Sequence, residues 1–390
     1  MNILQAIKNL FVQREEVSGM ENITTWDILQ HGLDWRTALS IPAVWHAVNL
    51  LSADVAKVPI DVFRKTNDGR ESDRSIAASV LLRESPNEAM TSYMFRRTLT
   101  AHAVLTGTGL AAIYRDISGA PKRLVVLPPP PQTTVELRNG SPVWLTSVNG
   151  VTETFADSDV LAIRGLSRDG LMGISPLETL RSALLLELAL QDHALAFFQK
   201  GLLLSGFLVS PRPLSPEEAA AIKASFASLY GGSRGQHGVA VLHGGIEWKP
   251  QVIDAEKSQL AEARQFGLRQ VANIFGLPPH KLGDPSRTSY ASLEQENADY
   301  LASSLDPWLV AWETECTKKL LRPIEQERGY YVEHNRNAYV RMSYADRVAG
   351  YAKLIEIGVM SPNEVRQKEN MSTIPEGDRY YVPANWVPAS

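Results

Sequence analysis

The sequence is poor in the features that secreted, membrane and nucleic-acid-gripping proteins need. It has one cysteine in 390 residues, so no internal disulfide can form. No stretch reaches the roughly 20 apolar residues of a membrane span, and the most apolar region, 183–209, is interrupted by charged and amide side chains. Lys and Arg number 39 against 43 Asp and Glu, a net charge of −4. This balance argues against a broad basic face for nucleic acid.

Motifs for metal, nucleotide or catalytic chemistry are also scarce. The eight histidines include no zinc-protease pair, and residues 165–173 lack the lysine and hydroxyl residue of a phosphate loop. We therefore expect no metal, no cofactor and no enzyme activity. Residues 231–235 (GGSRG) do fit the G-x-S-x-G pattern of hydrolases. A helix is expected before this pattern and a strand after it, the reverse of the hydrolase order, so a loop is favoured and a serine hydrolase using Ser233 is the alternative.

The first 29 residues predict an N-terminal arm. Apolar side chains fall on one helical face of its beginning: Ile3, Leu4, Ile7, Leu10 and Phe11. This pattern indicates a short amphipathic docking helix. A membrane-surface helix is the alternative, although only Lys8 and Arg14 would supply positive charge to anionic lipid.

The region up to about residue 170 predicts an α+β domain. Helical spacing marks residues 41–57 and 91–106, with Thr91 as a candidate N-cap. Residues 58–64 alternate as a strand and end at the turn 67–69. Further strand-like runs are separated by Gly, Pro and Asn: 110–115, 123–127, 133–137, 143–148 and 160–164. Helices mixed with short strands of this kind are typical of an α+β fold.

Long helices dominate the middle of the chain. Residues 176–200, with Leu184 and Leu188, are apolar nearly all round, so this helix must be buried against several neighbours. Both the same chain and other subunits are candidates for these neighbours. A compact insert, 201–253, follows, in which Ser215 and Glu218 form a capping box. A second helix covers 254–275.

A loop rich in Gly, Pro and Ser, 276–290, leads into a third helix, in which Trp308, Trp312 and Cys316 repeat at helical spacing. We expect Cys316 to be a buried small hydrophobe and Pro307 to kink this helix. Two smaller helices near 344–358 and 361–370 close the chain.

The order of several motifs resembles the phage portal proteins of long-tailed phages and gene-transfer particles. These motifs are 43–59 (AVWHAVNLLSADVAKVP), the Ser85-Pro86-Asn87 turn, 107–115, 170–177 (GLMGISPL), 198–201, 269–283 (RQVANIFGLPPHKLG), 358–366 (GVMSPNEVR) and 375–378 (PEGD). The resemblance implies a ring, usually of twelve subunits, around an axial channel. It implies an α+β portal fold with an α/β wing, a long-helix stem, a small α/β clip insert and a kinked helix.

The resemblance also divides the chain into parts. The wing would be 30–175, with the kinked helix and wing return at 291–344. The stem would be the helices 176–200 and 254–275, and the clip 201–253. The tunnel loop would be 276–290, and 345–390 a crown or wing edge.

The implied function is a channel at one capsid vertex of the virion, through which double-stranded DNA is packaged and ejected. The implied partners are further copies of the chain, the terminase large subunit, the major capsid protein and a head–tail adaptor protein, with assembly in the host cytoplasm and no membrane. A capsid structural protein without a channel is a further alternative.

Three sets of site residues follow from this map. For the tunnel loop we expect mobility and a cationic collar, and its candidate residues are His280, Lys281, Ser286, Arg287 and Thr288. The candidates for partner binding at the clip are Gly232, Ser233, Arg234, Gln236 and His237. The candidates for the subunit interface are Leu184, Leu188, Trp308 and Trp312.

Overall fold

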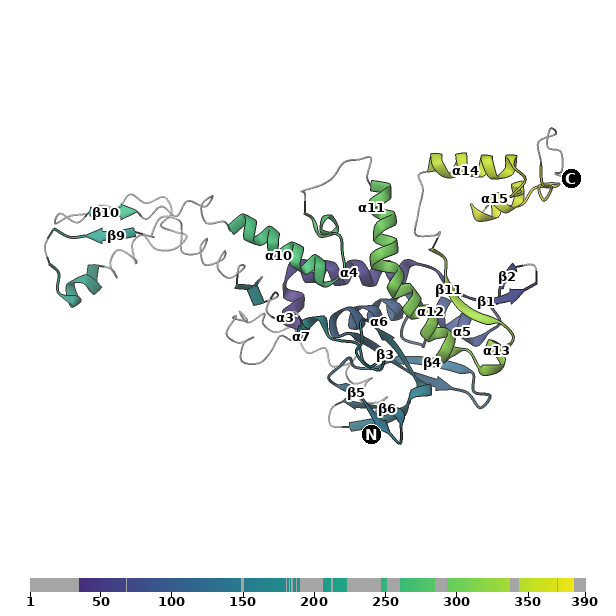
Figure 1. Cartoon of the computed structure of the whole chain (residues 1–390), viewed down its shortest axis with the longest axis horizontal. Coiled ribbons are helices and arrows are strands. Elements are labelled where there is room, and N and C mark those ends of the chain that lie inside the picture. The colour runs from purple at the N-terminus through teal and green to yellow at the C-terminus, as the bar shows by residue number, and fades with distance from the viewer. Residues whose placement is uncertain are drawn as a thin grey trace. The chain divides into compact units, whose positions relative to one another are not determined.

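The computed structural model combines helices with antiparallel strands, which confirms the α+β class (Figure 1). It describes residues 35–67, 69–148, 151–179, parts of 181–189, 206–211, 213–222, 247–250, 260–284, 293–336, 344–369 and 371–381. The chain divides into two compact units, Met1–His334 and Asn335–Ser390. Each unit is described by itself.

Helices α4 (Pro42–Lys57) and α6 (Ser92–Thr106) pack against each other in the first unit, and the short α3 (Trp35–Ser40) precedes them. The apolar face expected for α4 is buried, and Thr91 caps α6 by accepting a hydrogen bond from the Met94 amide. The Arg96 guanidinium donates to the carbonyls of Ala56 (2.6 Å) and Val58 (2.8 Å). Carbonyls at a helix C-terminus lack partners within the helix, so this buried arginine satisfies the end of α4. Burial lowers the pKa of Arg96 to about 10.

The first sheet joins distant parts of the sequence. Strand β1 (Ile60–Thr66) pairs with β2 (Gly69–Ser72) through the expected turn, and on its other edge with β11 (Tyr330–His334). Helix α5 (Ala77–Arg83) packs against β1. A strand from beyond residue 291 thus completes the sheet of the N-terminal region.

Two more three-stranded sheets enclose an apolar core. One has the order β4 (Pro121–Val126), β3 (Thr108–Arg115) and β8 (Val160–Arg164). The other is a meander of β5 (Thr133–Arg138), β6 (Ser141–Val148) and β7 (Val151–Ala156), followed by a 3-10 turn η1 (Asp157–Asp159). The core cluster between them includes Leu110, Leu127, Trp144 and Val160. Strand β7 was not anticipated from the sequence.

Helix α12 (Asp306–Leu320) packs against β8 and β11, and the short α13 (Pro323–Glu327) follows it. Glu315 accepts from the Ala162 amide (3.2 Å) and pairs with Arg164 (3.3 Å). The buried Lys319 amine binds the carboxylate of Asp157. Cys316 is fully buried, as expected, and burial raises the pKa of its thiol far above the ordinary value.

A π-helical segment interrupts the third long helix where a kink was expected. Helix α11 (Leu293–Tyr300) continues into the π segment η4 (Leu301–Leu305) and then into α12, whose first turn contains Pro307. Proline has no amide proton to donate into a helix. The π segment is wider than an α-helical turn, and it accommodates the hydrogen bond that Pro307 cannot donate.

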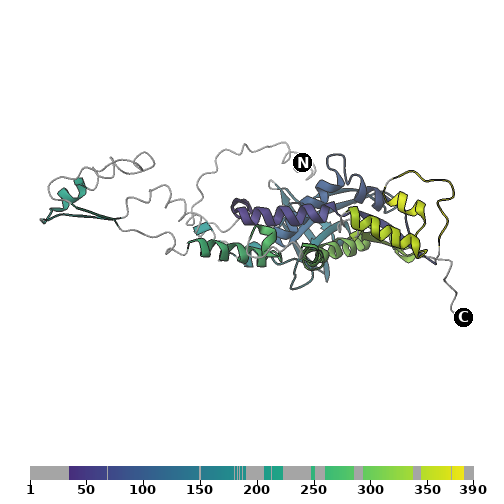
Figure 2. The same cartoon turned by 90° about the horizontal axis from the view of Figure 1, so that it is seen from above.

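The expected stem and insert are described in part. Helix α7 (Pro176–Thr179) begins the first stem segment, and α10 (Leu260–Ile274), which packs against α4, ends the second (Figure 2). Between them, β9 (Gly206–Val209) pairs antiparallel with β10 (Glu247–Pro250), so the two ends of the insert meet. The capping box at Ser215 and Glu218 is confirmed by two reciprocal hydrogen bonds of 3.0 and 3.2 Å.

The second unit contains α14 (Tyr344–Glu356) and α15 (Pro362–Lys368). Ser361 and Glu364 form a capping box at the start of α15. The buried Asn363 amide group binds both backbone groups of Ile374 and the Asp378 carboxylate (2.9 Å). The 375–378 motif therefore folds back onto α15.

Candidate functional site

The base of the expected tunnel loop is a capped helix end. The Leu277 amide donates to the Ala272 carbonyl (2.8 Å) and the Gly276 amide to the Asn273 carbonyl (3.3 Å). Gly276 has φ of 63°, in the left-handed region. These two bonds and this conformation make a Schellman motif, which ends α10 at a fixed place.

The next residues form a short turn that is tied back to α10. The 3-10 helix η2 (Pro279–Leu282) ends at Gly283, and the Asp284 amide then donates to the Pro279 carbonyl (3.2 Å). The Asp284 carboxylate is buried and pairs with Arg269 of α10, Nε to Oδ2, at 2.8 Å. A charge-assisted hydrogen bond of this kind is stronger than a neutral one.

Lys281 binds a side chain of α11, and His280 lies close to another. The Lys281 amine donates to Asn297 Oδ1 (2.7 Å) and lies 5.0 Å from the ring centroid of Tyr300. His280 Nε2 lies 3.5 Å from a carboxylate oxygen of Glu296. Residues 276–284 thus link two helices.

Residues 276–284 form ordered turns, and the mobility expected for 276–290 stays a prediction. The prolines and glycines that suggested mobility instead make tight, hydrogen-bonded turns. Lys281 is engaged by α11, so it is not a free cation of a collar. Ser286, Arg287 and Thr288 lie outside the described residues.

Tyr300 connects α11 to α4 of the first unit. Its side chain is fully buried, and its hydroxyl donates to Asp54 Oδ2 on α4 at 3.1 Å. One turn later, the Ser304 hydroxyl donates to the Gly276 carbonyl (2.6 Å). We call this set of contacts the loop anchor: Arg269, Gly276, His280, Lys281, Asp284, Glu296, Asn297, Tyr300, Ser304 and Asp54. Sequence reasoning missed all the partners of Lys281 and His280, because they come from a helix assigned only to packing.

Trp312 is not available to a neighbouring subunit. It is fully buried, its indole Nε1 donates to Thr100 (3.1 Å), and its ring meets Phe95 edge-on at 6.2 Å. The interface prediction for Trp312 is therefore wrong. An apolar helical spacing marks a buried face but does not say whether the same chain or another one covers it.

The other interface candidates have different outcomes. Trp308 is half-buried and lines a cavity of about 230 Å³ with Phe275 and Ile274. Leu188 is 8% exposed, and Leu184 lies outside the described residues. For these three residues, contact with another subunit stays a prediction.

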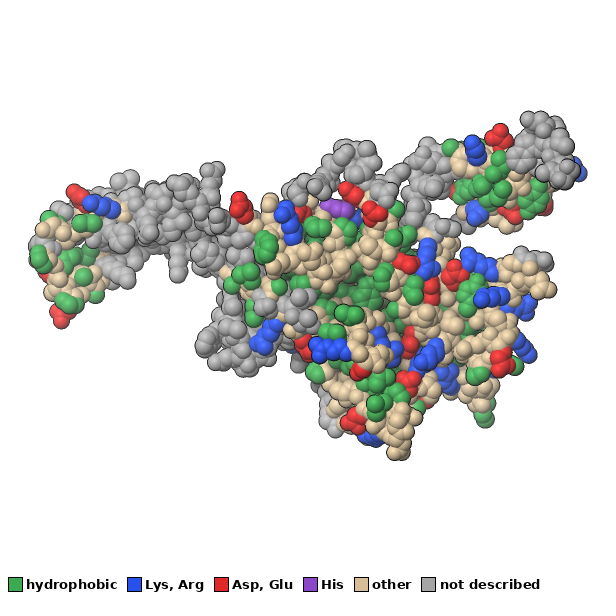
Figure 3. Space-filling view, viewed as in Figure 1, with side chains coloured by type: hydrophobic (Ala, Val, Ile, Leu, Met, Phe, Trp, Pro, Cys, Tyr) green, Lys and Arg blue, Asp and Glu red, His purple; other side chains and the backbone are tan. Residues whose placement is uncertain are grey.

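The clip candidates, Gly232, Ser233, Arg234, Gln236 and His237, also lie outside the described residues, as does the serine of the hydrolase hypothesis. Within the described ranges, no cluster of three His, Cys, Asp or Glu side chains is arranged to hold a metal ion. In the same ranges, no helix is long and apolar enough to span a membrane. Acidic and basic side chains are interspersed over the face seen in Figure 3.

Residues 170–173, which belong to one of the portal-like motifs, pack against the start of β3. Its Gly173 amide donates to Thr108 (2.9 Å), and a Cβ at Gly173 would lie 1.9 Å from the Gly107 carbonyl oxygen. The two backbones can approach this closely only because Gly173 has no side chain. The motif thus fixes the chain that leaves β8 for the stem onto the start of β3.

The described part of the chain is thus an α+β body with an insert that leaves and returns through paired strands, followed by a loop whose first residues are tied to α10 and α11. The chain belongs to the family of phage portal proteins, whose model matches residues 42–370. Portal proteins supply the channel for DNA packaging, so family membership assigns this role to the chain.

Two curated relatives agree with this assignment. The chain is 27% identical to the portal protein of Enterobacteria phage HK97, over 98% of this chain and 92% of that protein. It is 26% identical to a probable portal protein of Streptomyces phage phiC31, over 89% and 79% of the two chains.

Solved structures share the fold. An HK97-family portal protein from Corynebacterium diphtheriae has a TM-score of 0.57 at 19% identity, over 78% of this chain and 96% of that one. A chain from the neck of a native gene transfer agent particle, computed with C12 symmetry, has a TM-score of 0.58 at 20% identity, over 96% and 100%.

Proposed function

We propose that twelve copies of this chain form a ring at one capsid vertex and that double-stranded DNA passes through its axial channel. The family match over residues 42–370 carries this proposal. The similarity in fold to a chain of a neck with C12 symmetry supports the number of subunits. A closed ring also gives each subunit the same two contacts, one with each neighbour.

The parts of the ring follow the map given by the motifs. The wing is 30–175 with 291–344, the stem 176–200 and 254–275, the clip 201–253, the tunnel loop 276–290 and the crown or wing edge 345–390. The pairing of β9 with β10 supports the clip, because it closes the insert at its base. The packing of β11 against β1 supports the wing return.

The loop anchor gives the tunnel loop a fixed base. Asp284 is the last described residue of the loop, and Leu293 is the first described residue after it. Contacts of Asp284 with α10 and of Tyr300 with α4 hold the chain on the two sides. Because Lys281 is held by α11, Arg287 becomes the candidate for phosphate contact in the channel. Few cations in the channel would favour sliding, since each phosphate contact adds a salt-dependent attraction.

The partners are assigned to the ends of the ring. The clip, with Gly232, Ser233, Arg234, Gln236 and His237 at its tip, binds the terminase large subunit during packaging and the head–tail adaptor afterwards. The major capsid protein surrounds the wing. This assignment places the chain in the virion, after assembly in the host cytoplasm.

Native mass spectrometry of the purified full chain tests the ring, with Leu184→Asp as the matched variant. We expect a twelve-subunit species for the wild type and its loss in the variant, because an unpaired carboxylate in an apolar contact costs several kcal/mol. Monomers or two-fold dimers of the wild type under all assembly conditions would contradict the proposal. A fluorophosphonate probe that labels the wild type but not Ser233→Ala would favour the hydrolase alternative instead.

A further inference from the structure

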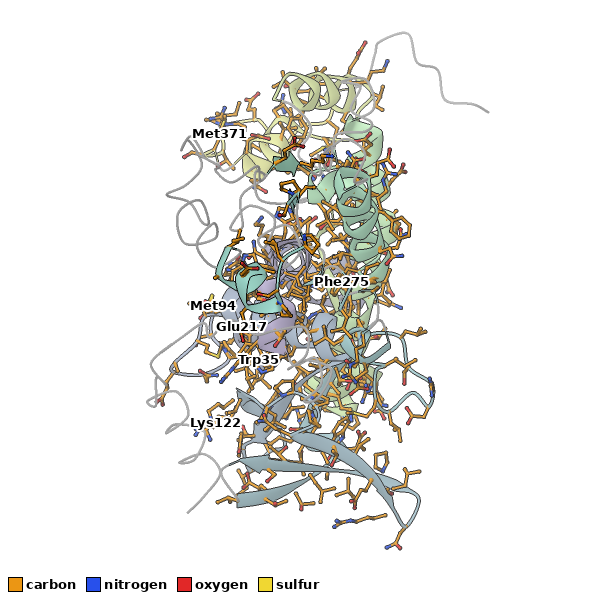
Figure 4. All side chains as sticks on the ribbon, turned by 90° about the vertical axis from the view of Figure 1, so that its left-hand side faces the viewer. Trp35, Met94, Lys122, Glu217, Phe275 and Met371 are labelled. Atoms are coloured by element: carbon orange, nitrogen blue, oxygen red, sulfur yellow. The ribbon has the colours of Figure 1, made fainter. Side chains whose placement is uncertain are left out.

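An apolar groove of the first unit is not explained by the channel function. It has a volume of about 680 Å³ and lies between α3, α4, α6 and the proline run at 128–131. Three of its large apolar side chains are exposed: Trp35 (50%), Trp45 (58%) and Met94 (45%). Trp35 and Met94 reach it from α3 and α6 (Figure 4). Contiguous exposed apolar surface marks an interaction site.

The polar side chains in the groove favour an occupant with negative charge. Arg36 and Arg97 both line it. The Arg97 guanidinium donates to the Asn49 amide oxygen and lies 5.9 Å from the ring centroid of Tyr93, and neither partner carries a charge. Its positive charge is therefore not neutralised by these two contacts. An occupant with apolar side chains and nearby carboxylates would fit both properties.

His102 adds a polar atom to the same groove. Its Nδ1 is buried and has no hydrogen-bond partner among the described residues. Burial lowers the pKa of this imidazole to about 4, so the ring is neutral at neutral pH. His102 therefore lines the groove without adding further positive charge.

The chain itself carries a segment with the required chemistry. The described chain begins at Trp35, which lines the groove, so the preceding residues leave from its edge. The apolar face expected for 3–11 would supply the apolar side chains. Residues 15–34 contain five acidic residues and no Lys or Arg. The 23 residues between Phe11 and Trp35 can extend roughly 75 Å, far more than a return to the groove requires.

We propose that residues 3–11 dock their apolar face in the groove of the same chain, with the acidic stretch beside Arg36 and Arg97. Docking within one chain does not require two molecules to meet, and the entropy cost of closing the connecting loop grows slowly with its length. The short connection also gives the segment a high effective concentration at the groove. This inference does not depend on the ring.

Disulfide trapping in the full-length protein tests the docking. Leu10→Cys combined with Met94→Cys places one thiol on the arm and one in the groove. The control combines Leu10→Cys with Val310→Cys, which is exposed to a similar degree (41%) on α12. The native Cys316 is fully buried and should not interfere. After mild oxidation, peptide mass spectrometry and non-reducing denaturing electrophoresis identify the link.

We expect a disulfide within one chain, formed about tenfold faster than in the control. Docking would hold residue 10 beside Met94, which lines the groove, whereas Val310 does not line it. Arg97→Gln should slow it about threefold at low salt, and Arg138→Gln, an exposed residue outside the groove, should not. A link between two chains would overturn the proposal, since the occupant would be the arm of another copy. A rate equal to that of the control would also overturn it. Electrophoresis of the denatured chains distinguishes a link within one chain from a link between two chains.

Discussion

Removal of the Tyr300 hydroxyl tests whether the loop anchor is held to the body of the subunit. Tyr300→Phe keeps the ring, and with it the packing and the contact with Lys281. It removes a donor from the Asp54 carboxylate, which is 6% exposed. Loss of a hydrogen bond to a buried charged group costs about 1–3 kcal/mol. Lys57 still pairs with Asp54 at 3.0 Å, so we expect Tyr300→Phe to lower the free energy of unfolding by an amount in the lower half of this range.

Thermal unfolding and hydrogen exchange measure the effect. A loss of about 1–2 kcal/mol lowers the Tm of a unit of this size by roughly 2–6 °C. The matched control is Tyr330→Phe, which removes a hydroxyl from Asp73 (2.8 Å) near the surface and should cost less than about 0.5 kcal/mol. Exchange of the amides in 276–284 should accelerate in Tyr300→Phe alone. Equal Tm values for the two variants, or unchanged exchange, would refute the reasoning.

Three further predictions concern the wing and the channel. Burial would raise the pKa of Asp157, but the hydrogen bond from Lys319 and further contacts lower it overall. The ionised Asp157 carboxylate therefore stabilises the fold above about pH 4, and this stabilisation is lost as the pH falls below that. The denaturation midpoints of the wild type and Asp157→Asn should converge in acid. A difference that stays constant with pH would contradict this. Gly173→Ala forces a backbone shift and should cost more than about 2 kcal/mol in chemical denaturation, and a neutral result would exclude the close approach. Arg287→Ala should change DNA retention across a salt series with rings intact, whereas Lys281→Ala should mainly lower stability; the reverse pattern would restore Lys281 to the channel.

Local rules of sequence predicted the first half of the wing well. The helix 41–57 and the N-cap at Thr91 depend on spacing and on neighbours within a few residues, and both are confirmed. The capping box at Ser215 was found for the same reason. Strand β7 was missed because its alternating residues are half-exposed and lack an apolar run.

Contacts between distant residues could not be predicted in the same way. Tyr300 and Asp54 are 246 positions apart, and nothing near either residue indicates the other. Trp312 is a second example, because apolar residues at helical spacing do not show which part of the structure will cover them. The composition of 276–290 suggested mobility, but the glycines and prolines of its first part are those that capped turns require.

Single-particle imaging of the purified full chain, without imposed symmetry, tests whether the chain forms a ring with a channel. We expect a ring of twelve subunits with an open axial channel, in which the loops that follow Asp284 form the narrowest point. Particles without a central hole, or assemblies without rotational symmetry, would contradict it and favour a capsid structural protein without a channel.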